Sequence, residues 1–247
     1  MSAERHADTR AYALLTLVFV LVHGIFYAAG LRFDRTTLIE VMHFLDPVLL
    51  RTQFWESVWH LHIQPPLLNV FTGAVLKVTP EAAWLFQACF LGFGLALYLS
   101  VYALQRWFGV RRTLAGAIAI GLLLSPSFLL YEHFLLYTVP CAALLTGAAL
   151  ALAHALERRS VAWLAGFFVL LLVLCATRSL FHLAFYLVAW AAVGMVARGW
   201  RRRALLTGLA PALLLVALYA KTAVLFGPFS VSTIMPKNLW IMTAGNL

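Results

Sequence analysis

Seven apolar runs of roughly membrane-spanning length follow one another along the chain, separated by short basic or polar breaks. They extend over residues 11–30, 82–105, 113–131, 134–153, 161–177, 179–197 and 204–226. About 20 consecutive apolar residues form a helix long enough to cross the hydrocarbon core of a bilayer. The pattern therefore predicts an all-α fold, a polytopic membrane helix bundle with about seven or eight spans.

The orientation of this bundle follows from where the arginines fall. They gather in three of the breaks, at 106–112, 158–159 and 198–203. Short cytoplasmic loops of membrane proteins are enriched in Lys and Arg. An eighth apolar run, 65–79, is shorter than the others and contains a lysine. If the N-terminus is cytoplasmic and this run does not cross completely, all three clusters are cytoplasmic, and we predict this arrangement.

The first apolar run has two interpretations. Arg5 and Arg10 precede it and small residues end it, as in a secretory signal peptide. Its length exceeds the apolar part of such peptides, which favours an uncleaved first span. Either interpretation places the loop that follows on the same side of the membrane.

The composition agrees with a membrane protein. Apolar residues make up 64% of the chain and charged residues 11%, whereas soluble domains contain about half and about a quarter. The net charge of +9 would also suit a nucleic-acid-binding protein, but that function needs the cations on one solvated face. We therefore expect an integral protein of the bacterial inner (plasma) membrane, in contact with membrane lipids and not with nucleic acid.

Within one predicted transmembrane domain, 1–247, three features lie on the outer side. They are a juxtamembrane loop at 31–64, a turn at 125–133 and a C-terminal segment at 227–247. Apolar residues recur at helical spacing in the loop, which predicts amphipathic helices on the membrane surface. Most of the acidic residues also lie here: Asp34, Glu40, Asp46 and Glu56 in the loop and Glu132 in the turn.

Several polar side chains lie in the loop and just after it. Asp46 precedes Pro47, which favours an extended or turn conformation at Asp46 and ends any helix before it. Farther along, His60, His62, Gln64 and Asn69 surround a Pro-Pro pair. His60 and His62 have the spacing of metal ligands on an extended segment, but no third ligand is evident. We therefore predict no metal-ligating residues. A divalent cation is the one cofactor that stays open as an alternative.

Two further charges lie close to apolar runs. Glu132 lies near the membrane boundary beside Tyr131, where an unpaired charge is unfavourable. Its alternatives are a structural ion pair and a catalytic carboxylate. Arg178 falls between two short runs. Its alternatives are an arginine that extends to the interface and a side chain that binds phosphate, for which the guanidinium is well suited.

The order of these features resembles the GT-C superfamily of membrane glycosyltransferases. A first span is followed by a long outer loop with an early Asp, by Gln-Pro-Pro-Leu opening an apolar run, by Ser-Pro with a nearby acid, and by Thr-Arg between two spans. The similarity is greatest to the branch of protein mannosyltransferases and aminoarabinose transferases. It covers residues 11–226, and only the order of these short motifs is specific.

The resemblance implies a transferase that moves a sugar from a polyprenyl-phosphate-linked donor to a lipid, glycan or protein acceptor on the extracytoplasmic side. Asp46 and Glu132 would be the catalytic acids of such a site, and Arg178 would face the donor phosphate. The sugar or acceptor would be bound by His60, His62, Gln64, Asn69 and Tyr131.

Two departures from the family pattern leave alternatives open. Pro47 stands where the family often has a second acid, so Asp34 or Glu40 is an alternative to Asp46. Family members also continue beyond this length, which implies a C-terminally shortened chain. Two other functions fit the same residues: a flippase-like transporter of lipid-linked sugars, and a shortened, non-catalytic transferase homologue.

Overall fold

The structure is a computed structural model that describes residues 2–41, 44–79 and 82–234. Within these ranges the fold is helical, with twelve helices and one isolated β-bridge. Four helices are long and apolar enough to cross a membrane: Asp8–Ala28 within α1 (Ser2–Ala28), α6 (Ala83–Trp107), α9 (Thr138–Arg158) and α12 (Arg201–Phe226). These helices confirm the prediction of an all-helical membrane protein.

The structure supports fewer complete crossings than the apolar runs suggest. A bent pair of helices, α7 (Arg112–Leu123) and α8 (Pro126–Glu132), would raise the number to five. The runs at 161–177 and 179–197 form α10 (Val161–Thr177) and α11 (Leu183–Val196), of 17 and 14 residues. Helix α11 is shorter than its apolar run because residues 179–182 are not helical. Its 14 residues extend over only about 21 Å. Seven or eight spans therefore stays a prediction.

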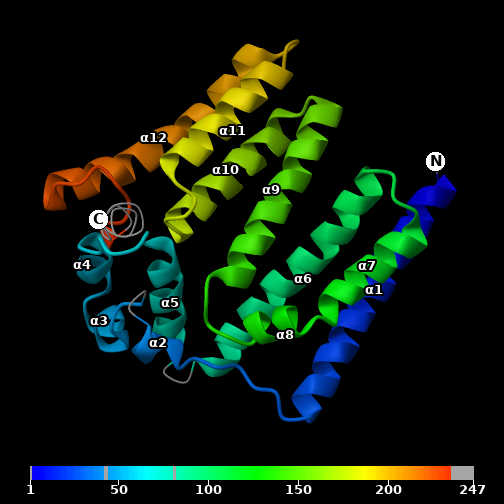
Figure 1. Cartoon of the computed structure of the whole chain (residues 1–247), viewed down its shortest axis with the longest axis horizontal. Helices are drawn as coiled ribbons and strands as arrows, with labels where there is room; N and C mark the ends of the chain where they lie inside the picture. The colour runs from blue at the N-terminus through cyan, green and yellow to red at the C-terminus, as the bar shows by residue number, and fades with distance from the viewer. Residues whose placement is uncertain (1, 42–43, 80–81, 235–247) are drawn as a thin grey trace, which may run out of the picture. The chain divides into compact units, whose positions relative to one another are not determined.

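The chain forms two compact units, and each is described by itself. The first contains residues 1–37 and 82–150, and the second contains residues 38–81 and 151–247. Helices α1, α6, α7 and α8 belong to the first unit, and α9 begins there (Figure 1).

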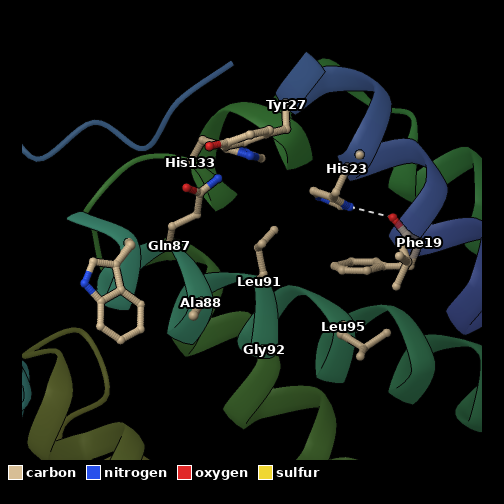
Figure 2. A pocket seen from close by; sticks show the side chains of 12 residues that line it. Phe19, His23, Tyr27, Gln87, Ala88, Leu91, Gly92, Leu95 and His133 are labelled. Carbon is tan, nitrogen blue, oxygen red and sulfur yellow. Dashed lines mark hydrogen bonds between the residues drawn. The ribbon is translucent and has the colours of Figure 1, made fainter. Parts of the chain in front are cut away.

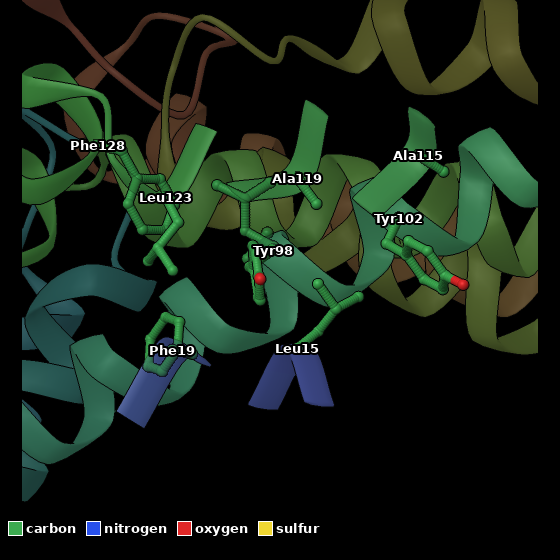
Figure 3. Close-up of a cluster of buried hydrophobic side chains, with 10 residues drawn as sticks. Leu15, Phe19, Tyr98, Tyr102, Ala115, Ala119, Leu123 and Phe128 are labelled. Carbon is green, nitrogen blue, oxygen red and sulfur yellow. The ribbon is translucent and has the colours of Figure 1, made fainter. Parts of the chain in front are cut away.

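The core of the first unit is a layer of aromatic and small side chains where α1 meets α6 and α7. Phe19 of α1 lies against Tyr98 of α6, with ring centroids 5.9 Å apart. Ala115 and Ala119 of α7 are fully buried. Their small side chains allow α7 to approach the other helices closely, and Figure 3 shows the two alanines beside the aromatic layer.

The apolar run 113–131 is not one straight helix. Helices α7 and α8 are bent by 60° at the short break between them. Ser125 caps α8, because its hydroxyl accepts a hydrogen bond from Phe128 N at 3.2 Å. Pro126 then occupies the first turn, where proline is favoured and where it disfavours a helical conformation at the residue before it. Most of the predicted turn 125–133 is thus helical, and helix α8 ends at Glu132.

A short backbone pairing ties the end of α8 to the segment after α1. Asp34 N donates to His133 O at 2.7 Å, and Leu135 N donates to Asp34 O at 3.0 Å. The hydroxyl of Thr37 donates to Leu135 O at 2.8 Å. These bonds hold residues 133–135 beside the chain that leaves α1.

The other end of the first unit carries an ion-pair cluster. Asp8 of α1 lies 3.0 Å from Arg112 Nη2 and 3.7 Å from Arg106 Nε. The first of the three basic clusters is therefore fixed to the start of α1. His23 lies fifteen residues farther along α1, or about 22 Å along the helix axis.

The second unit contains α10, α11 and α12, together with α5 (Leu67–Val78) and the part of the predicted outer loop from residue 38 onward. Gly208 allows α12 to approach α11 closely, because a Cβ there would lie 2.7 Å from the Trp190 ring. Tyr186 Oη donates to Gly208 O at 2.8 Å across the same contact.

The loop predicted to be amphipathic contains α2 (Thr37–Glu40), α3 (Pro47–Thr52) and α4 (Phe54–Trp59). Its position on a membrane surface stays a prediction. Of the predicted C-terminal segment 227–247, residues 235–247 lie outside the described residues.

Candidate functional site

Three buried titratable side chains meet in the first unit. His23 comes from α1, Glu132 from the last turn of α8, and His133 directly follows it. Their side-chain donor atoms all lie within 4.8 Å of one another. We call these three residues the His-Glu-His cluster. Among the described residues it is the one group of three with the composition and spacing of metal ligands.

Both imidazoles are oriented by their own helices. His23 Nδ1 lies 2.9 Å from Phe19 O, and His133 Nδ1 lies 3.0 Å from Leu129 O. A carbonyl oxygen only accepts hydrogen bonds, so each Nδ1 carries the hydrogen and each Nε2 is left for another partner. The two rings are stacked, with centroids 5.6 Å apart.

The partner of His23 Nε2 is the carboxyl group of Glu132. Oε2 of Glu132 lies 2.5 Å from this nitrogen. With His23 neutral and protonated on Nδ1, and with Glu132 ionised, both atoms would present lone pairs to each other. The contact is favourable only if a proton or a metal ion lies between the two groups. The charge of the cluster therefore depends on what occupies this position.

Glu132 is completely buried, with an exposed fraction of 0%. Within the described part of the chain, its second oxygen, Oε1, has no hydrogen-bond partner. The carboxyl group lies directly against Gly94 of α6, where a Cβ atom would overlap Oε1. Gly94 thus provides the space that allows a carboxylate to be packed against α6.

A cavity of about 530 Å³ adjoins the cluster. It is lined along α1 and α6 by Phe19, Val20, His23, Gly24, Tyr27, Trp84, Gln87, Ala88, Leu91, Gly92 and Leu95, together with His133. Figure 2 shows Tyr27, Gln87 and His133 toward one end and Leu95 and Phe19 toward the other. One end of the cavity is therefore polar and the rest is apolar, and the described residues that line it include neither Lys nor Arg.

Two of the predicted site residues belong to this unit. Glu132 does not line the cavity itself; it contacts His23, which does. Tyr131 is an exposed residue of α8 and is not part of the cavity lining, whereas Tyr27 of α1 is. The catalytic role of Glu132 and the binding role of Tyr131 stay predictions.

Asp46 and Asn69 lie in the second unit, close to each other. Asp46 has a non-helical backbone, with φ −49° and ψ 126°, and its Oδ1 accepts from Val48 N at 2.7 Å. It therefore caps α3, and it lines a cavity of about 480 Å³. Asn69 is buried, and its Oδ1 accepts from Leu45 N at 2.8 Å, next to Asp46. Both residues thus hold the loop in place.

The remaining predicted residues also belong to the second unit. His60 Nδ1 lies 2.9 Å from Glu56 O in its own helix, whereas His62 Nδ1 lies 2.9 Å from Thr233 Oγ1. The two histidines thus have different partners. Gln64 is half-buried, and Arg178 forms the C-terminal cap of α10. Their roles toward a substrate stay predictions.

Sequence reasoning missed His23, His133 and Gly94. A titratable residue inside an apolar run is unfavourable unless it has a partner or a function, so His23 could have been singled out. His133 adjoins Glu132 in the sequence. Nothing in the sequence indicates that Gly94 faces Glu132, because the two are far apart along the chain.

Comparison with known proteins adds no identification. No protein-family model, curated protein or solved structure matches this chain.

Proposed function

We propose that this protein is a membrane glycosyltransferase that uses a polyprenyl-phosphate-linked sugar as its donor. The observation that supports the proposal most is a largely apolar cavity along α1 and α6 whose polar end meets the His-Glu-His cluster. A polyprenyl-phosphate sugar likewise has a long apolar part, the polyprenyl tail, and a charged head group. In this proposal the polyprenyl tail lies along Leu91 and Leu95, and the head group lies beside His23 and His133.

The chemistry of the head group explains why titratable residues would be needed there. Transfer of the sugar leaves a phosphate anion on the lipid, and developing negative charge requires positive charge or hydrogen-bond donors nearby. The described residues that line the cavity include two imidazoles and neither Lys nor Arg. In this proposal the imidazoles supply the charge, as imidazolium or by binding a cation, and Glu132 positions His23.

The depth of the cluster fits the outer side of a membrane. His23 is near the C-terminal end of α1, which ends at Ala28, whereas Asp8 pairs with Arg106 and Arg112 near the start of α1. If the basic end is cytoplasmic, as the arginine pattern predicts, the cluster lies near the extracytoplasmic boundary. A lipid-linked donor on that side would reach it from the bilayer.

Filling the cavity should weaken donor binding without damaging the fold. Gly92 lines the cavity, and a Cβ atom there would meet nothing within 4 Å. The variant Gly92→Phe should therefore raise the donor KM at least ~10-fold, an effect of about 1.4 kcal/mol, because its ring occupies the space of the lipid chain. Release of polyprenyl phosphate from a panel of labelled lipid-linked sugars measures the reaction.

Gly121→Phe is the matched control for this substitution. Gly121 is an exposed glycine of α7, is equally free of neighbours within 4 Å, and does not line this cavity. Its KM should equal that of the wild type. Equal donor kinetics in the two variants would overturn the assignment of this cavity to the donor lipid.

Replacing Asp46 by Asn separates its charge from its structural role. Asn is as good a helix cap as Asp, so the hydrogen bond to Val48 N and the apparent Tm should be retained. If Asp46 is a catalytic carboxylate, sugar transfer should fall by about 10²-fold or more. Full transfer activity in this variant would remove Asp46 from the mechanism.

Sugar transfer must also be distinguished from lipid transport. Vesicles that contain the purified protein and a labelled lipid-linked sugar should release polyprenyl phosphate when an acceptor is supplied. Movement of the intact donor between leaflets, without such release, would contradict the proposal and support a flippase-like protein.

A further inference from the structure

We infer that His23, Glu132 and His133 bind a divalent transition-metal ion of the zinc type. Two nitrogen donors and one carboxylate oxygen lie within 4.8 Å of one another. Two imidazoles and one carboxylate are a recurrent ligand set of zinc sites that keep a fourth position open. Magnesium and calcium instead prefer sites made entirely of oxygen.

The hydrogen bonds around the cluster are those expected of metal ligands. Metal-bound histidines usually donate their other ring N–H to a carbonyl or carboxylate, which fixes the tautomer. His23 Nδ1 donates to Phe19 O, and His133 Nδ1 donates to Leu129 O. Each Nε2 is therefore available for an ion, and both rings are held in place by the helix that carries them.

An ion would replace the proton between His23 Nε2 and Glu132 Oε2. The two atoms are 2.5 Å apart, the separation of a short hydrogen bond, so they would have to move apart to bind an ion together. Two ligands of a tetrahedral zinc ion are about 3.3 Å apart at the usual bond lengths. Small side-chain rotations would bring the three donors to such distances, because the group as a whole spans no more than 4.8 Å.

Water or a molecule bound in the cavity would supply the fourth ligand. His23 and His133 both line it, so an ion held by them would have one side open to water or to a bound molecule. If the proposed sugar transfer is correct, the ion supplies the positive charge that the cavity lining otherwise lacks. Metal binding itself follows from the cluster and does not depend on that function.

The experiment measures zinc in the purified full-length chain, which should carry an affinity tag without histidine. After incubation with zinc and removal of free ions, the wild type should contain about one zinc per chain. His23→Gln, Glu132→Gln and His133→Gln should each bind zinc at least ~100-fold more weakly, because losing a direct ligand costs more than the ~10- to 100-fold of losing a residue that only orients one. His133→Gln is the decisive variant, because the hydrogen bond of the His133 ring is with the preceding helix, to Leu129 O, and the pairing of residue 133 with Asp34 uses the backbone alone.

His182→Asn is the matched control. His182 caps α11 by accepting from Ala184 N at 3.4 Å, and Asn is a good substitute at such a cap. Zinc content in this variant should equal that of the wild type. Replacement of zinc by cobalt should give the strong visible absorption of a four-coordinate site, which histidines on the surface would not produce.

Two outcomes would overturn the inference: a wild type that binds no stoichiometric zinc, cobalt or manganese, or a His133→Gln variant that binds as tightly as the wild type. The first would mean that a proton joins His23 to Glu132. The result is independent of the proposed function, because stoichiometric zinc without sugar transfer would refute only the transferase. Sugar transfer by the metal-free protein would refute only the role of the metal in it.

Discussion

Replacing His23 by Leu should lower the free energy of unfolding by about 3–5 kcal/mol, the usual cost of removing one partner of a buried charged pair. Glu132 is completely buried and has His23 as the partner of one oxygen, while its other oxygen has none among the described residues. Without the imidazole, neither oxygen would be hydrogen-bonded, and the carboxyl group would be desolvated without compensation. Titration of the protein in mixed micelles with a denaturing detergent measures this change.

A second substitution should restore the stability. In the double variant His23→Leu with Glu132→Met, both polar groups are replaced by apolar side chains of similar size. Such replacements of a whole buried pair are often neutral or stabilising, and the unbranched Met fits the narrow space beside Gly94. The double variant should be at least as stable as the wild type, yet it should neither transfer sugar nor bind zinc.

Comparison of the wild type, His23→Leu and the double variant shows whether His23 and Glu132 serve function or only structure. If the double variant is no more stable than His23→Leu alone, the instability comes from lost ring packing against Phe19 and His133. The explanation through an unpaired carboxyl group would then be wrong. Retained sugar transfer in a stable double variant would instead remove the cluster from the proposed active site.

Replacing Gly94 by Ala should have the second large effect, a loss of about 1–3 kcal/mol from overpacking, together with loss of zinc binding. The new Cβ would overlap Glu132 Oε1 and lie 3.1 Å from Glu132 Cγ. The whole carboxyl group would therefore have to move, which breaks its contact with His23. Stability in mixed micelles and zinc content measure the two consequences.

Two comparisons test this explanation. Gly92→Ala, on the same helix, should cost nothing and should gain about 1 kcal/mol of helix propensity, because nothing lies within 4 Å of its new Cβ. In a Glu132→Ala background, Gly94→Ala should also cost little, because the carboxyl group that it meets is gone. A penalty for Gly94→Ala that is as large in this background would show that another contact is responsible.

The apolar pattern alone was sufficient to predict a helical membrane protein and the positions of two of its three longest helices. The runs at 82–105 and 204–226 correspond to α6 and α12 within a few residues. This succeeds because about 20 apolar residues in a row can satisfy their backbone hydrogen bonds in lipid only as a helix. The non-helical backbone at Asp46 is similarly local, because it follows from the next residue, Pro47.

The arrangement of the candidate site was decided by tertiary structure. The sequence drew attention to Glu132 as a charge near the membrane boundary, but its partner His23 lies 109 positions away and its space comes from Gly94 on a third helix. The bend between α7 and α8 and the pairing of Asp34 with residues 133–135 bring these parts together. Hydropathy describes how favourable each residue is in lipid, whereas the meeting of two polar side chains depends on how helices pack, and no local pattern contains that information.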